Sequence, residues 1–320
     1  MVWRSVEAEL QAAVGVVFPS AQLVVVDGGT RCLSLALGNA SAATVFDLAS
    51  LTKPLVTTTL IAQLIDEQRL SLSDMVDDRF TVGELLSHSS GLPSWKALAP
   101  PGVVDKAFVL AEIRRTAPAY VRGTRSIYSD LGFILLGNLL EQRLGPLDQA
   151  FATCVAEPLG LALTFHPTAS QCAPTEGNLC GVVHDDNARA MGGVAGHAGL
   201  FGSANEIAKL VAVLVEIWHG DQGLLSPATL QHFWSGAGVP DSTWCLGWDR
   251  PSAHGSSAGE HWPKDGVGHL AFTGCSVWID PRRRRFVVLA SNRVHPTRDN
   301  ERIRQLRPRL HDLIVKVLDF

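Results

Sequence analysis

Ser50 and Lys53 stand three residues apart in the stretch VFDLASLTKPLV, residues 45–56. On a helix this spacing places both side chains on one face, where hydroxyl and amine can reach each other. A serine hydroxyl becomes a good nucleophile when a base takes its proton, and burial would favour the neutral amine form of Lys53. Pro54 fits this position if the helix begins near Ser50. Ser50 could equally be an ordinary helix cap, because a single S-x-x-K is a weak signal.

Tyr128 precedes Ser129 and Asp130 in RSIYSDLGFILLGNLLE, where an apolar helix begins. A serine or aspartate is common at a helix start, which accounts for residues 129 and 130 without any chemistry. Tyr128 has no such explanation. A phenol that points into a cleft beside positive charge would have a lowered pKa and could relay protons.

The stretch GHLAFTGCSVWIDP, residues 268–281, is typical of a strand with small residues along one edge. Strand alternation predicts that His269, Ala271 and Thr273 point to one face, and Leu270 and Phe272 to the other. A lone histidine on a strand is more often structural than catalytic. Its candidacy depends on the residues that accompany it.

Two histidines and two carboxylates, in HDDNAR and GHAG, offer an alternative metal site: His184, Asp185, Asp186 and His197. Their spacing matches no common ligand pattern, and glycines around His197 indicate a tight turn. We favour a role in shaping a substrate pocket, and expect neither a metal nor an organic cofactor. Insensitivity to chelators would support this interpretation.

The elements that must position these residues differ along the chain. Strand patterns at 21–42 and in the last quarter of the chain flank a middle section of helices and Pro- or Gly-rich loops. A helix is expected from Ser50 to about Gln68, and another from roughly 301 to 318. We therefore predict an α/β (α+β) fold, with an antiparallel sheet flanked by helices and built from both termini. Residues 1–72 and 191–320 would form the sheet domain and residues 73–190 a mainly helical inserted domain, with the active site in the cleft between them.

Composition restricts the partners. Lys and Arg number 27 against 31 Asp and Glu, a balance that favours neither nucleic acid nor an anionic membrane and so points to a small molecule. The run PRRRR at 281–285 is expected to be a solvated hairpin tip. The six cysteines form no C-x-x-C pair, and Glu7 and Glu9 interrupt any leader-like apolar run, so we expect reduced thiols and a cytoplasmic location. Oligomeric state is left open.

Taken in order, the three motifs resemble those of serine hydrolases of the class C β-lactamase and penicillin-binding-protein family, including related esterases and D-amino-acid peptidases. The matching motifs are Ser50 to Lys53, Tyr128 to Asp130, and His269 to Ala271. The segments LLSHSSGLP (85–93) and GVVHDDNARAMGGVAGHAGLF (181–201) are similar to a β-lactamase-related subgroup. The resemblance covers most of the chain and implies the fold and the nucleophile more specifically than the substrate.

The chain also departs from that family. His269-Leu270-Ala271 replaces the Lys-Thr-Gly of β-lactamases, which removes groups that would hold a β-lactam carboxylate. Asp130 replaces a common asparagine, and its carboxylate would tend to keep Lys53 charged, so that Tyr128 takes over the base role or the pair shares a proton.

The resemblance implies acyl transfer through Ser50, with Lys53 and Tyr128 handling protons and with the amides of Ser50 and a residue near Phe272 binding the oxyanion. His269 would support Tyr128 or bind a substrate oxygen. We expect hydrolysis of an ester or small amide. The alternatives are an acyltransferase, a weak β-lactamase, or a non-catalytic binding or scaffold protein on the same fold.

Overall fold

Residues 20–27, SAQLVVVD, form a strand that is buried on both faces. Leu23 and Val25 pack into one hydrophobic cluster, and Val24 and Val26 pack into another on the opposite face of the sheet. The alternation follows from the period of two along a strand. A strand covered on both faces reads as a continuous apolar run, as this one does.

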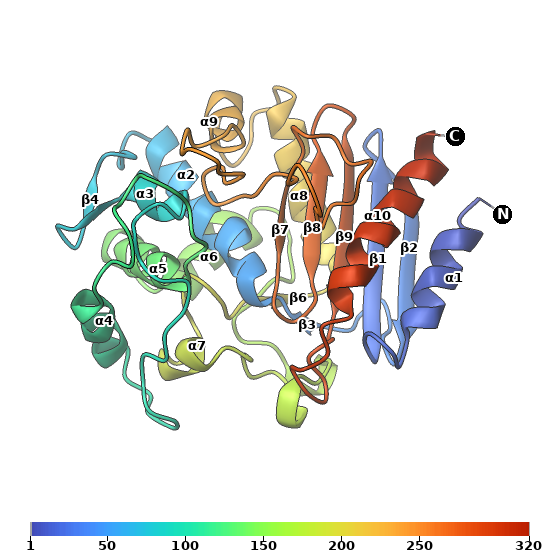
Figure 1. Ribbon diagram of the computed structural model, residues 1–320, viewed down its shortest axis with the longest axis horizontal. Coiled ribbons are helices and arrows are strands. Elements are labelled where there is room, and N and C mark those ends of the chain that lie inside the picture. The colour runs from blue at the N-terminus through green and yellow to red at the C-terminus, as the bar shows by residue number, and fades with distance from the viewer. Residues whose placement is uncertain (1, 320) are drawn as a thin grey trace.

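The computed structural model describes residues 2–319 and contains a five-stranded antiparallel sheet in the order β2-β1-β9-β8-β7 (Figure 1). Its strands are β1 (Ser20–Asp27), β2 (Thr30–Gly38), β7 (Val267–Leu270), β8 (Ser276–Asp280) and β9 (Arg285–Ser291). Ala21 pairs with Ser291, so strands from opposite ends of the chain lie side by side. The predicted antiparallel sheet built from both termini is confirmed.

Helices cover both faces of the sheet. Helices α1 (Arg4–Ala13) and α10 (Ile303–Asp319) lie on one face and contribute Leu10 and Leu310 to its core. Helix α8 (Ala204–Trp218) packs on the other face against β1 and β9. It begins where Ser203 accepts a hydrogen bond from the amide of Glu206, as expected for a helix cap.

The other half of the molecule is mainly helical (Figure 1). The remaining α-helices within residues 2–319 are α2 (Thr59–Asp66), α3 (Val82–Leu86), α4 (Lys106–Arg115), α5 (Asp130–Leu144), α6 (Leu147–Phe151), α7 (Asp186–Ala190) and α9 (Pro227–Phe233). Single turns are η1 (Ala49–Leu51), η2 (Lys53–Thr58), η3 (Ala152–Ala156), η4 (Ala169–Gln171) and η5 (Glu176–Asn178). Two-residue strands form the pairs β3 (Phe46–Asp47) with β6 (Phe201–Gly202) and β4 (Met75–Val76) with β5 (Phe80–Thr81).

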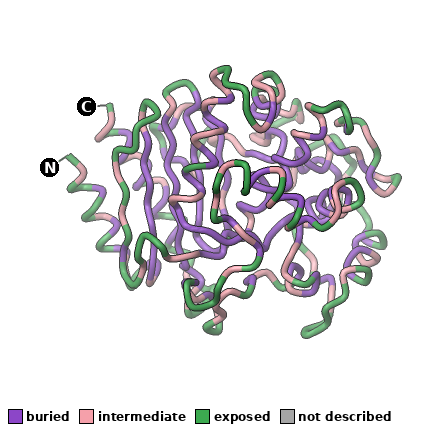
Figure 2. Tube along the Cα trace, turned by 180° about the vertical axis from the view of Figure 1, so that it is seen from behind, coloured by how far each residue is buried: buried purple, intermediate pink, exposed green. Residues whose placement is uncertain are grey.

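One hydrophobic core runs from the sheet into the helical half, and it includes Val24 and Val288 as well as Leu55 and Leu135. Figure 2 shows buried chain through the sheet and on into the helices. The domain boundaries at 72 and 190 stay a prediction. None of the helices between residues 2 and 319 is both long and apolar enough to cross a membrane.

The expected regular helix from Ser50 is wrong in detail. The chain passes from a 3-10 turn, η1, to π-helical turns in η2, and becomes α-helical only at Thr59. Pro54 lies in the first turns of this segment, where its missing N–H and ring disfavour regular α-helical bonding. Ala49, directly before the nucleophile candidate, has a left-handed φ of 42°.

The prediction of one continuous strand over residues 268–281 is also wrong. Residues 271–275 form a turn between β7 and β8, in which Ala271 N donates to Cys275 O and Gly274 N donates to Ala271 O. Gly274 has a φ of 105°, which favours glycine. Strand alternation therefore ends at Leu270. The predicted hairpin tip is confirmed for residues 281–284, which form the turn between β8 and β9. The prediction that the whole run is solvated is wrong for Arg285, which begins β9, is buried and pairs with Asp27 and Asp319.

Candidate active site

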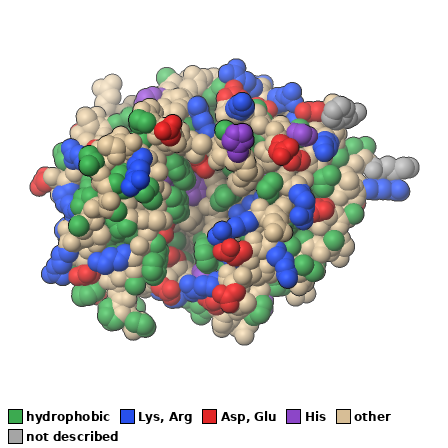
Figure 3. Space-filling view, in the orientation of Figure 1, with side chains coloured by type: hydrophobic (Ala, Val, Ile, Leu, Met, Phe, Trp, Pro, Cys, Tyr) green, Lys and Arg blue, Asp and Glu red, His purple; other side chains and the backbone are tan. Residues whose placement is uncertain are grey.

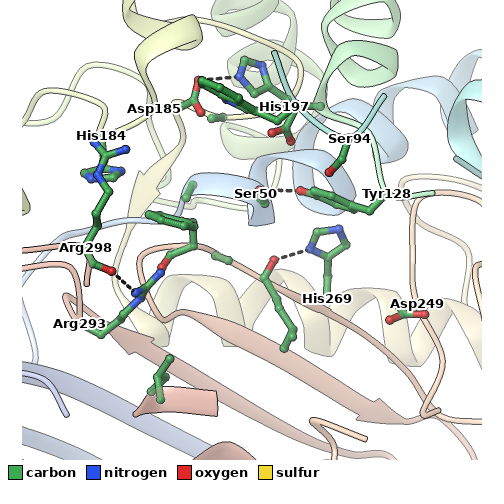
Figure 4. Close-up of a pocket in the computed structure, with 18 of the residues that line it drawn as sticks. Ser50, Ser94, Tyr128, His184, Asp185, His197, Asp249, His269, Arg293 and Arg298 are labelled. Atoms are coloured by element: carbon green, nitrogen blue, oxygen red, sulfur yellow. Dashed lines mark hydrogen bonds and ion pairs between the residues drawn. The ribbon is translucent and has the colours of Figure 1, made fainter. Parts of the chain in front are cut away.

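Ser50, Lys53 and Tyr128 converge in the structure, and Figure 4 shows Tyr128 beside Ser50. Lys53 Nζ lies 3.1 Å from Ser50 Oγ, and Tyr128 Oη donates to the same oxygen at 2.7 Å. The turn η1 presents Ser50, η2 carries Lys53, and Tyr128 stands two residues before α5. One hydroxyl therefore contacts two groups that can exchange protons with it, which is the arrangement that nucleophilic catalysis requires.

Lys53 is fully buried, and its ammonium has three neighbours besides apolar side chains. Nζ lies 2.6 Å from Asp130 Oδ1 and donates to His197 O at 3.1 Å, in addition to its contact with Ser50. Burial lowers the pKa of Lys53, and the Asp130 carboxylate partly offsets this shift. Both influences on Lys53 expected from the sequence are present.

The expectation of a lowered pKa for Tyr128 is wrong. Burial raises the pKa of the Tyr128 phenol well above 10, and the nearby Asp130 carboxylate raises it further. Lys53 Nζ lies 4.8 Å from the centre of the Tyr128 ring, but its charge is paired with Asp130. The phenol is therefore neutral and acts as a hydrogen-bond donor to Ser50.

His88 holds the segment that carries Tyr128, although no role was predicted for it. Its Nδ1 accepts a hydrogen bond from the amide of Ser129 at 3.1 Å, and its carbonyl accepts bonds from Ile127 N and Tyr120 Oη. Its ring lies 4.8 Å from that of Tyr128. Burial keeps the pKa of His88 well below its usual value, so the ring is neutral and can accept the Ser129 hydrogen bond.

The segment 181–201 forms the wall behind Lys53. His197 supplies the carbonyl that binds Nζ, and its Nε2 lies 2.8 Å from Asp185 Oδ1. Asp185 also caps α7 by accepting from Ala188 N. Gly196 and Gly137 lie in close contact, so that a Cβ on Gly196 would be 2.2 Å from Phe133 O. The wall thus rests directly on the backbone of α5.

We expect Gly196→Ala to reduce both stability and activity. A methyl group there has no space, so the segment must move away from α5 and take the His197 carbonyl away from Lys53. A loss of about 2 kcal/mol of unfolding free energy and of at least 10-fold in kcat is expected. Urea denaturation and steady-state kinetics measure both quantities. Gly236→Ala, where the nearest atom is an arginine side chain at 3.5 Å, is the matched control and should change neither.

The turn after β7 forms the opposite wall. His269 donates from Nδ1 to Leu270 O at 2.8 Å, and burial lowers its pKa to about 3, so its ring is neutral. Its ring centre lies 6.0 Å from that of Tyr128. Ala271 is buried, whereas Phe272 is 47% exposed and stacks on His184. His269 at the end of β7, and Ala271 and Phe272 in the turn, all line the same cavity as Ser50.

Two arginines hold this turn. Arg307 donates to the carbonyls of Ala271 and Cys275, and Arg293 donates to the carbonyl of Phe272 and lies over its ring. Both side chains are about 95% buried and line the cavity. Every hydrogen bond that either guanidinium makes within residues 2–319 goes to a backbone carbonyl. Two buried positive charges therefore border the cavity without a carboxylate partner.

The cavity has a volume of about 620 Å³. Figure 3 shows it as a hollow between the helical half and the sheet half. It brings together Ser50, Tyr128, Asp130, His269, Ala271 and Phe272, with Lys53 buried behind Ser50. Sequence reasoning missed several lining residues that no motif marks: Ser94, Trp95, Trp244, Asp249, Arg293, Arg298, Arg304 and Arg307.

The residues considered for a metal site are paired with other groups. His184 Nε2 lies 3.3 Å from Glu176, and Arg189 pairs with Asp186. His197 pairs with Asp185, and Asp185 Oδ1 is also occupied by the amide of Ala188. Within residues 2–319, no group of three or more His, Cys, Asp or Glu side chains is placed to hold a metal ion.

The chain is similar to known proteins over most of its length. A family model described as Beta-lactamase matches residues 4–310. The relative named "Putative D-alanyl-D-alanine carboxypeptidase" in Salmonella agona is 30% identical over 316 residues, which cover 81% of this chain and 72% of the relative.

Solved structures share the fold at lower identity. EstCE1, described as a hydrolase with promiscuous acyltransferase activity, has a TM-score of 0.80 at 20% identity and covers 98% of both chains. The octameric penicillin-binding protein homologue from Pyrococcus abyssi has a TM-score of 0.78 at 19% identity, covering 99% of this chain and 78% of that one.

Proposed function

The chain belongs to the beta-lactamase family of serine hydrolases, and from this premise we propose that Ser50 forms an acyl-enzyme with an ester or small amide substrate. The observation that carries the proposal is the double contact of Ser50 Oγ, with Lys53 Nζ at 3.1 Å and Tyr128 Oη at 2.7 Å. This hydroxyl borders a cavity large enough for a small substrate.

Lys53 is the proposed base. Its buried ammonium passes a proton to Asp130, 2.6 Å away, and the neutral amine then takes the proton of Ser50 as the hydroxyl attacks the carbonyl carbon. Tyr128 begins the step as a neutral phenol, because burial raises its pKa. It gives its proton to the leaving group and recovers one from Lys53, and Asp130 then returns its proton to Lys53. The proton of Ser50 has thereby passed to the leaving group, and Lys53, Tyr128 and Asp130 end the step as they began it.

The amides of Ser50 and Phe272 are the proposed donors to the oxyanion. Both residues line the cavity, and neither amide donates a hydrogen bond to another group among residues 2–319. Free donors held by a fixed turn stabilise the charge that develops on the carbonyl oxygen. His269, with a neutral ring and Nε2 free of partners in the described chain, would accept a hydrogen bond from a substrate or from Tyr128.

Water is the proposed acceptor of the acyl group, and an alcohol or amine that enters the same cavity would make the protein an acyltransferase. A non-catalytic scaffold on this fold is the alternative of another class. The two contacts of Ser50, with Lys53 and with Tyr128, argue against it, because a binding protein has no need of them.

Arg293 and Arg307 favour a substrate that carries an acidic group. A buried guanidinium without a carboxylate partner gains stability when an anion reaches it, and planar guanidinium groups suit carboxylates. These charges lie beside His269-Leu270-Ala271, the residues that stand where β-lactamases have Lys-Thr-Gly. They support the D-amino-acid peptidase branch of the proposal, and a weak β-lactamase activity, over neutral esters.

Arg307→Gln is therefore expected to raise the KM of a carboxylate-bearing substrate about 10- to 100-fold relative to its neutral methyl ester. The ratio of the two KM values separates lost charge from a disturbed turn, which would affect both substrates. Arg309→Gln, two residues further along α10 in an ion pair with Glu9, is the control. An unchanged ratio in Arg307→Gln contradicts the assignment.

A substrate panel tests the function as a whole: p-nitrophenyl esters, D-aminoacyl amides and peptides with a free carboxyl end, and a chromogenic cephalosporin. Turnover of at least one class, lost in Ser50→Ala and unaffected by a chelator, supports the proposal. Turnover that a chelator abolishes would favour the metal alternative. No turnover combined with tight binding of a panel member would favour the binding-protein alternative.

A further inference from the structure

Asp47 is a fully buried carboxylate that ties together three walls of the candidate active site. Its Oδ1 accepts from the amide of Ala49 at 2.8 Å, and its Oδ2 accepts from the amide of His184 at 2.6 Å. Its own carbonyl accepts from Thr273 Oγ1 at 2.8 Å. The turn that presents Ser50, the segment 181–201 and the turn after β7 thus meet at one residue outside the cavity lining.

The contact with Ala49 bears directly on the nucleophile. Ala49 has a φ of 42°, a conformation in which a side chain is disfavoured. The bond from Ala49 N to the carboxylate two residues earlier is an Asx-turn, which stabilises the backbone there. Ser50 follows at once, so the direction of its hydroxyl depends on this bent backbone.

We propose that Asp47 is a positioning residue that holds Ser50 in its reactive orientation, by fixing the left-handed turn at Ala49 and joining it to the wall at His184. The inference rests on the proposed role of Ser50 as the nucleophile. Asp47 touches neither the cavity nor the reacting atoms and acts only through its neighbours.

Protonation of Asp47 should weaken this hold. Burial raises the pKa of Asp47 to about 6, although two amide hydrogen bonds oppose the shift. The ionised carboxylate offers acceptors to both amides, whereas the protonated carboxyl turns one oxygen into a donor. The hold on Ser50 should therefore weaken as the pH falls through about 6.

The charged and titratable groups that face Asp47 are Asp185 and Arg189 from the segment 181–201, Cys172, and Cys275 from the β7–β8 turn. Pairing with His197 keeps the pKa of Asp185 well below its usual range, and burial raises the pKa of both thiols to about 11. Between pH 5 and pH 8 the Asp185 carboxylate stays ionised and the two thiols stay neutral, so that Asp47 is the group that titrates beside these three.

Stability has the opposite pH dependence. Because the folded-state pKa of Asp47 is raised, its contribution to stability is present below pH 3.8, the ordinary value, and is lost as the pH rises through about 6. Asp47→Asn, which removes a buried charge, is therefore expected to fold at pH 7.5. The titration of Asp47 therefore does not lower the stability of the wild type at acidic pH, so unfolding from this cause cannot account for a loss of reactivity there.

The test measures the second-order rate of Ser50 modification by a fluorophosphonate probe from pH 5 to pH 8, by intact mass. For wild type, the rate is expected to fall about 10-fold below pH 6, where the turn loosens. Asp47→Asn should react about 10-fold more slowly at pH 8 and lack this acid limb, while Asp47→Ala should lose about 100-fold. Because glycine adopts positive φ freely, Ala49→Gly in the Asp47→Ala background should recover at least about 10-fold.

Asp280→Asn is the matched control, since Asp280 is another buried carboxyl with a pKa raised by burial and lies outside the site. It should leave the rate and the pH profile of wild type unchanged. Equal rates and pH profiles for wild type and Asp47→Asn would overturn the inference, as would an Ala49→Gly change that rescues nothing. A folded wild type that forms no adduct would overturn the proposed nucleophile itself, which is a separate failure.

Discussion

Ser50→Ala is expected to fold normally and to lose at least about 10⁴-fold in kcat on any substrate that the wild type hydrolyses. The hydroxyl oxygen is the only heavy atom removed, and it is the shared partner of Lys53 and Tyr128. Without it no acyl-enzyme forms, and binding plus the oxyanion donors supply only residual catalysis. Steady-state kinetics measure the loss, and a fluorophosphonate adduct on wild type should be absent from the variant.

Ser94 provides the control for this experiment, because it is another serine that lines the cavity. Ser94→Ala should keep the adduct. If Ser50→Ala retained substantial turnover, or if the adduct moved with Ser94, a different nucleophile would have to be sought.

Lys53→Met is the second large effect, with kcat expected to fall about 10³-fold through loss of the base. It should also destabilise the fold by about 3 kcal/mol, because the Asp130 carboxylate is left without its partner in a mostly enclosed site. Kinetics report the first loss and urea denaturation the second. The two readouts need not move together.

The double variant Lys53→Met/Asp130→Asn separates the loss of kcat from the loss of stability. Removing both charges should restore most of the lost stability, because the pair lies at 2.6 Å and neither charge is then left alone. Activity should stay low. A double variant that regained activity with stability would mean that Lys53 serves folding and that Tyr128 or another group is the base.

Periodicity and turn chemistry were enough to predict the elements at both ends of the chain. The strand pattern at 21–42 predicted β1 and β2, and the helix expected at roughly 301–318 is α10. These elements depend on residues that are close together in the chain, so the sequence alone is enough to predict them. The S-x-x-K spacing predicted the contact of Ser50 with Lys53 for the same reason, since three residues of helical chain fix the distance.

Features that depend on residues distant in the chain could not be predicted from the sequence. The pKa of Tyr128 depends on burial and on Asp130, and Lys53 cannot lower it while its charge is paired. Arg293 and Arg307 reach the cavity because β9 and α10 pack beside the β7–β8 turn. No spacing of residues in the sequence predicts this packing. The break at residues 271–275 carries a usable signal, Thr-Gly, but the apolar residues around it resemble one strand.

The pairing of β1 with β9 has a consequence for how the enzyme comes into being. Ser20 N donates to Asn292 Oδ1 across 272 positions of sequence, and Ala21 pairs with Ser291. Contacts between such distant segments close large loops and form slowly. A chain emerging from the ribosome reaches Ser50 early, yet the β7–β8 turn that completes the cavity comes more than two hundred residues later. The growing polypeptide thus carries Ser50 before the cavity around it exists, and the reactivity proposed for Ser50 should begin only when the last strands join the sheet.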